Sequence, residues 1–378
     1  MMYYKGIKIR LLPTTEQEIL LWKHIHCSRF IWNYMLALQE QRYKNGEKHL
    51  SKFDMIKLLT PLKQDDNYKW LNEVSNSTLQ RVCLDLDSSY IKFYNKINNK
   101  PKFKSKKNAK CSFPVCDAIG RTYFKNNKVN VQKVGKILYS TKFTIPQGND
   151  KKIINPRILY VGNKWILSFN IICENQANDL KGKMGIDLGI KELAVVSFDN
   201  KQIVFHNINK SKKMRTLECK IKHLQRNVSR KYKTNGCYDK TKSILKTENQ
   251  IKKIKYHIQN IRLNYIHQCT HKLITYYPQK IVMEDLNIKG LLKNRHLSKA
   301  IQDQCLYEFI RQMKYKCEWN NIDFIQADKF YPSSKTCSNC GCIKQDLKLS
   351  DRIYKCNYCG LIIDRDYNAA INLMNYST

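Results

Sequence analysis

The sequence predicts a multidomain protein of the mixed α/β class, and three observations lead to this fold class. A chain of 378 residues can bury more than one hydrophobic core. Its hydrophobic pattern changes from helical spacing to strand alternation at a basic, proline-containing connector, residues 98–110. Further along, four cysteines with metal-ligand spacing interrupt a series of strands and helices. We therefore expect a helical lobe, a small β-barrel and an α/β domain that carries a cysteine module.

The N-terminal part predicts one strand followed by a helical lobe. Residues 3–12 alternate between apolar and polar side chains as a strand does. Thr15 and Glu18 resemble a capping box, which marks the start of a helix. Over residues 16–97 apolar side chains recur at helical spacing. Several helices should therefore pack together in this stretch.

Strand alternation in residues 111–174 predicts the small β-barrel. Residues 158–161 and 164–172 flank Gly162-Asn163, a dipeptide typical of a hairpin turn. The N-terminal strand could join this barrel.

The α/β domain should begin with three short strands, at residues 184–190, 192–198 and 202–206. Two long basic helices follow and should form an antiparallel hairpin. Each keeps a three-four apolar spacing, in Met214, Leu217, Ile221, Leu224 and Val228, and again in Ile251, Ile254, Ile258, Ile261 and Tyr265. The remaining elements are expected as a strand at 281–286, a helix near 300–320, a strand at 322–327 and a final helix from 366.

The charge of the chain indicates a polyanionic partner. Lys and Arg number 68 against 31 Asp and Glu, which gives a net charge of +37. Codon bias could explain abundant Lys, Asn, Ile and Tyr, but it should also supply many Glu. We therefore expect nucleic-acid binding.

Other composition features argue against a membrane or secreted protein. Apolar runs are too short for a membrane span, and the first residues lack the apolar core of a signal peptide. The 15 cysteines are odd in number and mostly scattered, which is typical of a reducing compartment. We expect a cytoplasmic protein without a membrane partner.

Three carboxylates lie in apolar surroundings where a basic chain should avoid them. Asp187 interrupts the strand-like run 184–190, Glu284 interrupts 281–286, and Asp366 opens the final helix. A buried acid is costly unless a positive charge compensates it. Two divalent cations about 4 Å apart would do so and would support phosphodiester hydrolysis. Oxygen ligands favour Mg²⁺ or Mn²⁺ at such a site.

Each carboxylate also has an ordinary explanation. Asp366 could be a helix cap, Asp187 a turn residue, and Glu284 the solvated end of a strand. Asp285 and Asp364 are the nearest competitors for the proposed roles, since each lies within two residues of a chosen acid. The conjunction of three acids with a basic chain favours the metal site.

The cysteine module consists of two matched Cys-x-x-Cys-Gly knuckles. Fifteen residues separate the second cysteine of the first knuckle from the first cysteine of the second. Four thiolates close a tetrahedral Zn²⁺ site and leave no open position, so this zinc should be structural. The four ligands are expected to be Cys337, Cys340, Cys356 and Cys359. Cys342 is either an alternative ligand or a bystander.

Some basic and aromatic residues are candidates for nucleic-acid contacts. The connector offers Lys102, Lys104, Lys106 and Lys107, which bind nucleic acid or are merely solvated. Phe103, Tyr123 and Phe124 lie among basic residues and could stack on bases.

His24-Ile25-His26 resembles the histidine pair of single-strand transposases. That chemistry needs both rings on one metal. This segment is predicted as helix, where residues two apart diverge by about 200°. We therefore expect no metal at this pair.

Several strings together resemble a known family. They are Gly-Ile-Asp-Leu-Gly-Ile, Ile-Val-Met-Glu-Asp-Leu-Asn-Ile-Lys-Gly, Tyr-Pro-Ser-Ser-Lys-Thr-Cys-Ser-Asn-Cys-Gly and Asp-Arg-Asp-Tyr-Asn-Ala-Ala-Ile-Asn-Leu, in this order. Cys27-Ser-Arg-Phe-Ile-Trp-Asn33 and Pro101-Lys-Phe-Lys-Ser-Lys-Lys107 extend the match over nearly the whole chain. The sequence resembles the TnpB (OrfB) proteins of bacterial insertion sequences, and type V CRISPR nucleases are similar in the C-terminal part.

The resemblance implies a RuvC-like nuclease domain of the RNase H fold, with Asp187, Glu284 and Asp366 as its metal-binding acids. It also implies a zinc ribbon before the final helix. The implied division is a β-barrel (wedge-like) domain at 1–12 and 98–178, a helical recognition lobe at 13–97, the nuclease domain at 179–334 and 362–378, and the ribbon at 335–361.

The resemblance further implies a guide RNA transcribed from the element's own end. The substrate would be double-stranded DNA that matches the guide beside a short motif read by the protein. We expect a monomer that carries RNA. Two alternatives stay open, a guide-directed DNA-binding regulator of transposition with little or no nuclease activity, and a transposase that joins strands itself.

Overall fold

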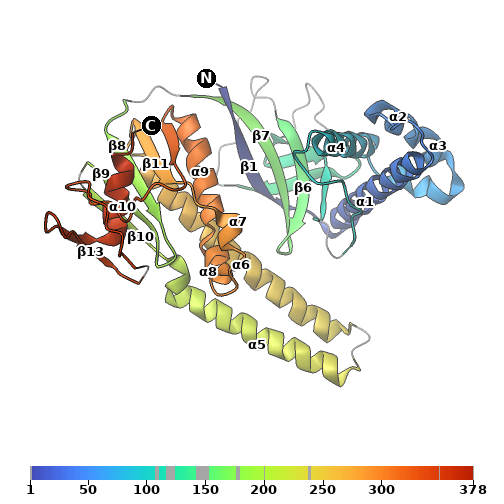
Figure 1. Ribbon diagram of the computed structural model, residues 1–378. Coiled ribbons are helices and arrows are strands. Elements are labelled where there is room, and N and C mark those ends of the chain that lie inside the picture. The colour runs from blue at the N-terminus through green and yellow to red at the C-terminus, as the bar shows by residue number, and fades with distance from the viewer. Residues whose placement is uncertain are drawn as a thin grey trace. The chain divides into compact units, whose positions relative to one another are not determined.

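The computed structural model describes residues 2–106, 110–115, 124–141, 153–175, 179–199, 201–236, 240–348 and 350–377. The chain divides into two compact units, Met2–Glu174 and Asn175–Thr378 (Figure 1). Each unit has its own hydrophobic core, as expected for a multidomain chain.

The helical part of the N-terminal unit comprises α1 (Thr15–Lys44), α2 (Lys52–Lys57), α3 (Leu59–Gln64), the short helix η1 (Asp66–Glu73) and α4 (Asn76–Tyr94). Its core contains Ile31, Met35, Leu36, Leu79 and Leu86, all buried. The predicted helical lobe is confirmed. The predicted capping box is wrong by one residue.

Thr14 and Gln17 form that capping box instead of Thr15 and Glu18. The Thr14 side chain accepts from the Gln17 backbone N–H, and the Gln17 side chain accepts from the Thr14 backbone N–H. Glu18 is engaged elsewhere, because its Oε1 accepts a hydrogen bond from Trp165 Nε1 at 3.1 Å. The sequence fits either pair, so only this tertiary contact separates them.

The second part of this unit is a seven-stranded sheet of order β2-β6-β7-β1-β5-β4-β3. Its strands are β1 (Met2–Leu12), β2 (Ser112–Pro114), β3 (Phe124–Lys125), β4 (Lys128–Val131), β5 (Gly135–Ser140), β6 (Ile154–Val161) and β7 (Lys164–Glu174). The N-terminal strand β1 lies at the centre and pairs antiparallel with β5 and β7. Within the described residues the edge strands β2 and β3 do not pair, so the predicted barrel is a half-barrel.

The expected hairpin joins β6 and β7. Gly162 and Asn163 both have positive φ, 58° and 59°, as a tight two-residue hairpin turn requires. That prediction is confirmed.

The C-terminal unit is built on a five-stranded sheet of order β10-β9-β8-β11-β12. Its strands are β8 (Lys183–Leu188), β9 (Glu192–Phe198), β10 (Lys201–His206), β11 (Lys280–Glu284) and β12 (Asp323–Ala327). The first three form an antiparallel meander, and β11 and β12 add parallel to β8. All five predicted strands are confirmed.

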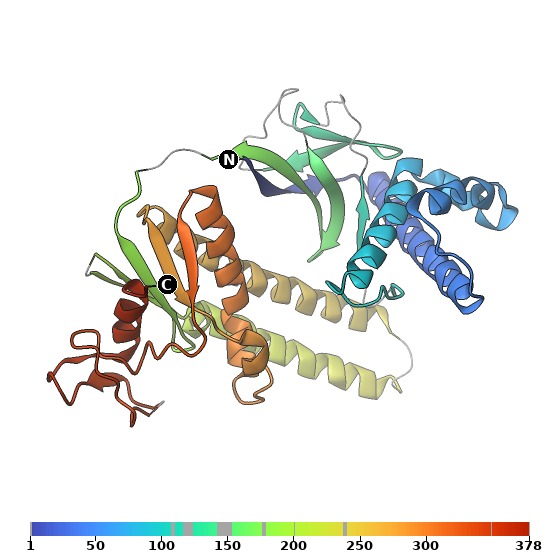
Figure 2. The ribbon, with the colours of Figure 1, turned by 45° about the horizontal axis from the view of Figure 1, so that its top comes forward.

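Helices cover both faces of this sheet (Figure 2). Ile281 and Met283 of β11 face one core together with α6 (Lys242–Ile274) and α9 (Leu306–Trp319). Val282 between them faces Leu373 of α10 (Arg365–Met374) on the other side. This alternation is why the strand is apolar throughout.

The predicted antiparallel helix hairpin consists of α5 (Lys212–Thr234) and α6, after the short helix η2 (Ile208–Lys210). Tyr232 Oη donates to Glu248 Oε1 at 2.9 Å, and Arg262 Nη2 lies 3.3 Å from Glu218 Oε1. These pairs place the start of one helix beside the end of the other. The hairpin prediction is confirmed.

The helix predicted near 300–320 is interrupted. It divides into α8 (Ser298–Gln304) and α9 because Cys305 adopts a left-handed conformation with φ of 55°. A short helix α7 (Ile288–Leu291) precedes them, and a two-stranded sheet of β13 (Ile353–Lys355) and β14 (Ile362–Asp364) supports the cysteine module. Among the described residues, no helix has the length and apolar character that a membrane span requires.

Candidate functional site

Two of the candidate carboxylates lie on neighbouring parallel strands. Ile186 of β8 pairs with Met283 of β11, and Asp187 and Glu284 are the next residues. In a parallel pair, residues at one level project to the same side of the sheet. The two carboxylates therefore leave the sheet side by side, near the ends of both strands.

Helix α10 brings the third carboxylate to the same place. A Cβ atom at Gly185 would lie 2.0 Å from the Ala370 carbonyl oxygen and 2.3 Å from the Met374 nitrogen. The helix therefore passes directly over β8, and only glycine permits this approach. Asp366 lies one turn before Ala370, toward Asp187.

The charges of Asp187 and Glu284 are not fully compensated at this site. Burial raises the pKa of Asp187 well above its usual range, and the neighbouring carboxylates of Asp366 and Glu284 raise it further. Burial also raises the pKa of Glu284. A raised carboxyl pKa means that the ionised form lacks positive compensation. A site with uncompensated negative charge of this kind favours the binding of a cation.

Arg365 is a cation beside these carboxylates that the sequence did not predict. Its Nη2 lies 3.1 Å from Asp366 Oδ1, and it partly opposes the rise in the pKa of Asp187. An arginine beside a predicted helix start usually points to solvent, so the sequence offered no signal for this contact.

The two competing acids make other contacts, and Asp364 also contributes to the raised pKa of Asp187. Asp364 is the N-cap of α10 and accepts hydrogen bonds from the backbone N–H groups of Asp366 and Tyr367, both at 3.0 Å. Asp285 is exposed and accepts from Gln326 Nε2 at 3.0 Å. The capping role that Asp366 could have filled therefore belongs to Asp364.

The four module cysteines form the most compact ligand set. Among the described residues, they are the only three or more His, Cys, Asp or Glu side chains whose ligand atoms all lie within 4.8 Å of one another. The three carboxylates are not part of such a group. Two cations about 4 Å apart can be bound by carboxylates that are farther from one another than the ligands of a single ion. Ligands on opposite sides of the cation pair are separated by the pair itself.

The sulfur geometry fits a tetrahedral zinc site. Cys337 and Cys359 have their Sγ atoms 3.6 Å apart, and so do Cys340 and Cys356. Four sulfurs about 2.3 Å from a central ion are about 3.8 Å apart. A hydrogen bond from the Leu361 backbone lowers the pKa of Cys359 to about 6, which favours the thiolate. The set fits structural Zn²⁺.

Cys342 lies outside the ligand set. It is exposed, and its carbonyl oxygen accepts from the Cys337 backbone N–H at 2.9 Å. The glycines of the two knuckles, Gly341 and Gly360, have positive φ of 76° and 72°. Cys342 is therefore a bystander next to the turn.

Two buried asparagines tie the cysteine module to α10. Asn368 Nδ2 and Asn372 Nδ2 both donate to the Thr336 carbonyl oxygen at 2.7 Å. Asn368 Oδ1 also accepts from the Ser338 backbone N–H, inside the first knuckle. The helix that carries Asp366 is thus held by the module. Sequence reasoning missed both residues, although their four-residue spacing marks one helix face.

The connector lysines differ in their surroundings. Lys102 and Lys106 are exposed, and Lys107 lies outside the described residues. Lys104 is half-buried, and its Nζ lies 3.3 Å from the centroid of the Trp32 ring. Burial and nearby Arg157 lower the pKa of Lys104 to about 8.

The histidine pair of α1 holds no shared metal position. His24 is buried, its Nδ1 lies 2.8 Å from the Leu20 carbonyl oxygen, and its Nε2 accepts from the Ser75 backbone N–H. His26 is exposed on another side of the helix. The predicted divergence is confirmed.

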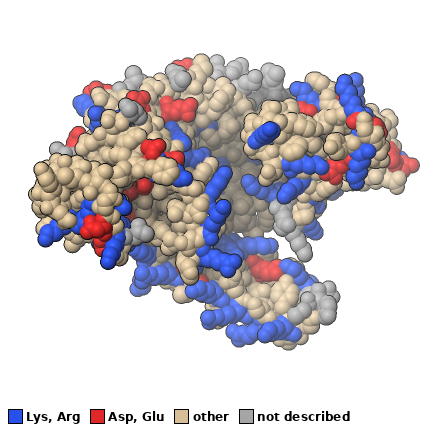
Figure 3. Space-filling view, in the orientation of Figure 1, with Lys and Arg blue, Asp and Glu red and all other residues tan. Residues whose placement is uncertain are grey.

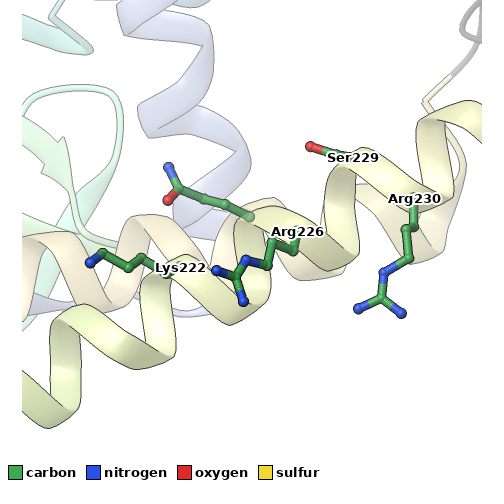
Figure 4. Close-up of a pocket in the computed structure, with 5 residues that line it drawn as sticks. Lys222, Arg226, Ser229 and Arg230 are labelled. Carbon is green, nitrogen blue, oxygen red and sulfur yellow. The ribbon is translucent and has the colours of Figure 1, made fainter.

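A basic stripe along α5 was also missed. Lys222, Arg226 and Arg230 recur every four residues, and all three line one shallow pocket of about 540 Å³. Lys and Arg gather over this hairpin in Figure 3, and the side chains of Arg226 and Arg230 point the same way in Figure 4. Among the described residues, none of the three forms an ion pair with a carboxylate. Their spacing in the sequence was the available signal.

Three family models match separate parts of the chain. The helix-turn-helix domain of the OrfB proteins of IS605 elements matches residues 1–48, which form β1 and α1 here. The OrfB_IS605 model, described as a probable transposase, matches residues 170–295. The Cas12f1-like TNB domain matches residues 307–373, which include the four cysteines.

The chain belongs to the TnpB (OrfB) family of IS605 elements.

Relatives of this TnpB-family protein match it over nearly its whole length. It is 28% identical over 374 residues to a candidate RNA-guided DNA endonuclease of Streptomyces pristinaespiralis, covering 98% of this chain and 88% of the relative. It is 25% identical to InsQ of Escherichia coli K12, also named a candidate RNA-guided DNA endonuclease, covering 98% and 91%. The CRISPR-associated endodeoxyribonuclease Cas12f1 of Sulfoacidibacillus thermotolerans is 27% identical, covering 56% and 50%.

A solved structure shows the fold of this TnpB-family protein. The protein chain of a cryo-EM Cas12f1–sgRNA–target DNA complex superposes with a TM-score of 0.61 at 14% sequence identity, covering 99% of both chains. The chain therefore has a mixed α/β, multidomain, Cas12f-like fold.

Proposed function

We propose that this protein is an RNA-guided DNA endonuclease of a transposable element, which hydrolyses DNA phosphodiester bonds with the help of divalent cations. The observation that carries the proposal is that the carboxylates of Glu284 and Asp366 both raise the pKa of Asp187. The three acids therefore act on one another at one site. These acids come from β8, β11 and α10, which are far apart in the sequence. The names of two relatives that match nearly the whole chain support the same activity.

The sheet topology supports a nuclease domain of the RNase H type, here RuvC-like. An antiparallel meander with two parallel strands added beside its first strand is the arrangement expected of that fold. We accordingly propose the division into a β-sheet domain at 1–12 and 98–178, a recognition lobe at 13–97, a nuclease domain at 179–334 and 362–378, and a zinc ribbon at 335–361.

The residues present fit a pair of Mg²⁺ or Mn²⁺ ions, because three oxygen-donor acids share a site with too little positive charge. When bound, such ions supply an activated water and neutralise the charge on the leaving oxygen. Asp187 and Glu284 would hold them from the rigid sheet, and Asp366 from the first turn of α10. Arg365 would keep the Asp366 carboxylate oriented.

The partners we propose are a guide RNA and double-stranded DNA that matches it beside a short motif. Base pairing would then supply sequence specificity, while the protein holds the backbone of the duplex. The basic stripe on α5 and the connector lysines Lys102, Lys104, Lys106 and Lys107 are candidate backbone contacts. One protein copy with its RNA is the proposed assembly.

Replacement of one acid tests the proposal. The Asp187→Asn variant should lose cleavage of guide-matched DNA in Mg²⁺ and still bind that DNA, because asparagine keeps the shape and removes the charge. The Asp285→Asn variant is the matched control and should cut normally. Cutting by Asp187→Asn at the wild-type rate would remove the assignment of this site.

A transposase is the second candidate, since one family model carries that description. Purified protein mixed with element ends should then give strand-transfer products. Occupied, matched DNA that stays intact in Mg²⁺ would instead indicate a binding regulator.

A further inference from the structure

A groove on α1 carries features of a base-stacking site. It has a volume of about 590 Å³ and is lined mainly by one face of α1, flanked by Trp70 of η1 and Phe103 of the connector. Trp70 is 39% exposed and Phe103 is 54% exposed. The Trp70 and Phe30 rings meet edge to face with centroids 5.0 Å apart. Large aromatic rings in an open groove beside cations are typical of surfaces on which unpaired bases stack.

A second, smaller pocket lies next to this groove. It has a volume of about 280 Å³, and Arg29 lines both cavities. The other cations that line it are Lys104, Lys110 and Arg157. Its one lining carboxylate, Asp85, forms an ion pair with Arg157. In the described part of the chain, Arg29, Lys104 and Lys110 have no ion pair.

Ser28, whose hydroxyl is unsatisfied, also lines this cationic pocket. Ser28 is 5% exposed, and its Oγ has no hydrogen-bond partner among the described residues. A buried polar atom without a partner is costly. An anion with oxygen acceptors would satisfy the hydroxyl and the cations together. The chemistry of the pocket therefore fits a phosphate group.

The connector is fixed so that consecutive residues serve the two cavities. Trp32 Nε1 donates to the Lys102 carbonyl oxygen at 3.1 Å. Asn33 Nδ2 donates to the Lys104 carbonyl oxygen at 3.0 Å, and Asn33 Oδ1 accepts from the Lys104 backbone N–H at 2.8 Å. Phe103 lines the groove and Lys104 lines the pocket.

We propose that the groove and the pocket together bind one unpaired nucleotide of the guide RNA. The base stacks on Phe103 and on the Trp70–Phe30 pair, and the phosphate binds Arg29, Lys104 and the Ser28 hydroxyl. This inference rests on the proposed function for the identity of the partner. RNA is the favoured source because its loops present unstacked bases before any DNA is bound, whereas double-stranded DNA offers unpaired bases only after it has been opened at a cost.

Of the three aromatic candidates from the sequence, the structure supports Phe103. Phe124 is buried in the core of the half-barrel, so its predicted stacking on bases is wrong. Tyr123 lies outside the described residues.

The test measures binding of a short single-stranded oligoadenylate to the full-length, nucleic-acid-free protein, against an RNA duplex of equal length. The Phe103→Ala and Arg29→Gln variants should bind the oligoadenylate roughly tenfold more weakly, the effect of losing one stacked base or its phosphate contact. Their duplex binding should stay unchanged. Phe53→Ala is the matched control, because Phe53 is 63% exposed and lines neither cavity.

Wild-type oligoadenylate binding by Phe103→Ala, or an equal loss of duplex binding, would overturn the proposal. If Phe103→Ala lowers the melting temperature but leaves oligoadenylate binding intact, the groove is a packing surface and the proposal is overturned. Parallel measurements with an oligodeoxyadenylate test whether the ligand is RNA. The assignment to RNA is wrong if the DNA oligomer binds as tightly and loses as much affinity in Phe103→Ala. Asp187→Asn should leave this binding unchanged, so the proposed nuclease function and this inference can fail separately.

Discussion

At the scale of single residues, Asp187 is held where its charge is unfavourable. Its folded-state pKa lies above the unfolded value of about 4. The ionised carboxylate therefore destabilises the cation-free fold at neutral pH, and this penalty disappears below about pH 4, where the group is protonated in both states. The sequence revealed this acid because it interrupts an apolar strand. It could not reveal Arg365, which depends on the position of α10.

We predict that Asp187→Asn stabilises the cation-free protein. In EDTA at pH 7 its melting temperature should exceed that of the wild type by at least about 2 °C. The difference should shrink as the pH falls toward about 4. Addition of Mg²⁺ should raise the melting temperature of the wild type and not that of the variant. Asp285→Asn is the control, and an equal gain there would exclude a specific effect of burial.

At the scale of elements, the position of α10 depends on the absence of a side chain at Gly185. Helical spacing predicted this helix, and apolar content predicted β8. Neither pattern predicts how closely α10 approaches β8. The closest approach is at Gly185, which faces the Ala370 carbonyl oxygen and the Met374 nitrogen. The break at Cys305 and the shift of the capping box were missed for a similar reason, since both depend on contacts that local propensity does not describe.

We predict that Gly185→Ala displaces α10. The added methyl group meets backbone atoms that cannot rotate away, so the free energy of unfolding should fall by about 1–3 kcal/mol or more. Cleavage should fall with it, because Asp366 moves away from Asp187. Urea unfolding followed by circular dichroism measures the first effect. Gly6→Ala is a matched control, since its Cβ would meet only Asn170 Oδ1 at an ordinary 3.4 Å.

At the scale of the whole molecule, two features concern the entire chain. Charge predicted a nucleic-acid partner, yet the sequence did not show where the unpaired cations gather, because that requires knowing which helix faces are covered. The four cysteines were predicted as one set from their spacing. Their connection to the carboxylate site through Asn368 and Asn372 was not, since it joins segments that only the fold brings together.

We predict that the α5 stripe contributes phosphate contacts. Arg226→Gln should reduce the slope of log affinity against log salt concentration by about 0.9 for duplex DNA, the value for one lost phosphate contact. Lys231→Gln on the same helix is the matched control, because Lys231 Nζ already donates to Ser243 Oγ and Thr247 Oγ1. Fluorescence anisotropy over a salt series measures both slopes, and equal slopes for both variants would contradict the assignment.

We predict that loss of zinc also inactivates the carboxylate site. Cys359→Ser should lower the metal content and the melting temperature, and should reduce cleavage even in excess Mg²⁺, because α10 loses its support from residues 333–338. Cys342→Ser should change none of these, since Cys342 lies outside the ligand set. Normal cleavage by a zinc-free Cys359→Ser protein would show that the module and the site are independent.

The late position of α10 in the chain has a consequence during translation. Asp187 and Glu284 leave the ribosome well before Asp366, and the cysteine knuckles that hold the last helix are made only shortly before it. A nascent chain that ends before α10 therefore lacks one of its three proposed cation ligands, however well its sheet has folded. Truncated products that lack α10 should consequently be unable to carry out the proposed cleavage.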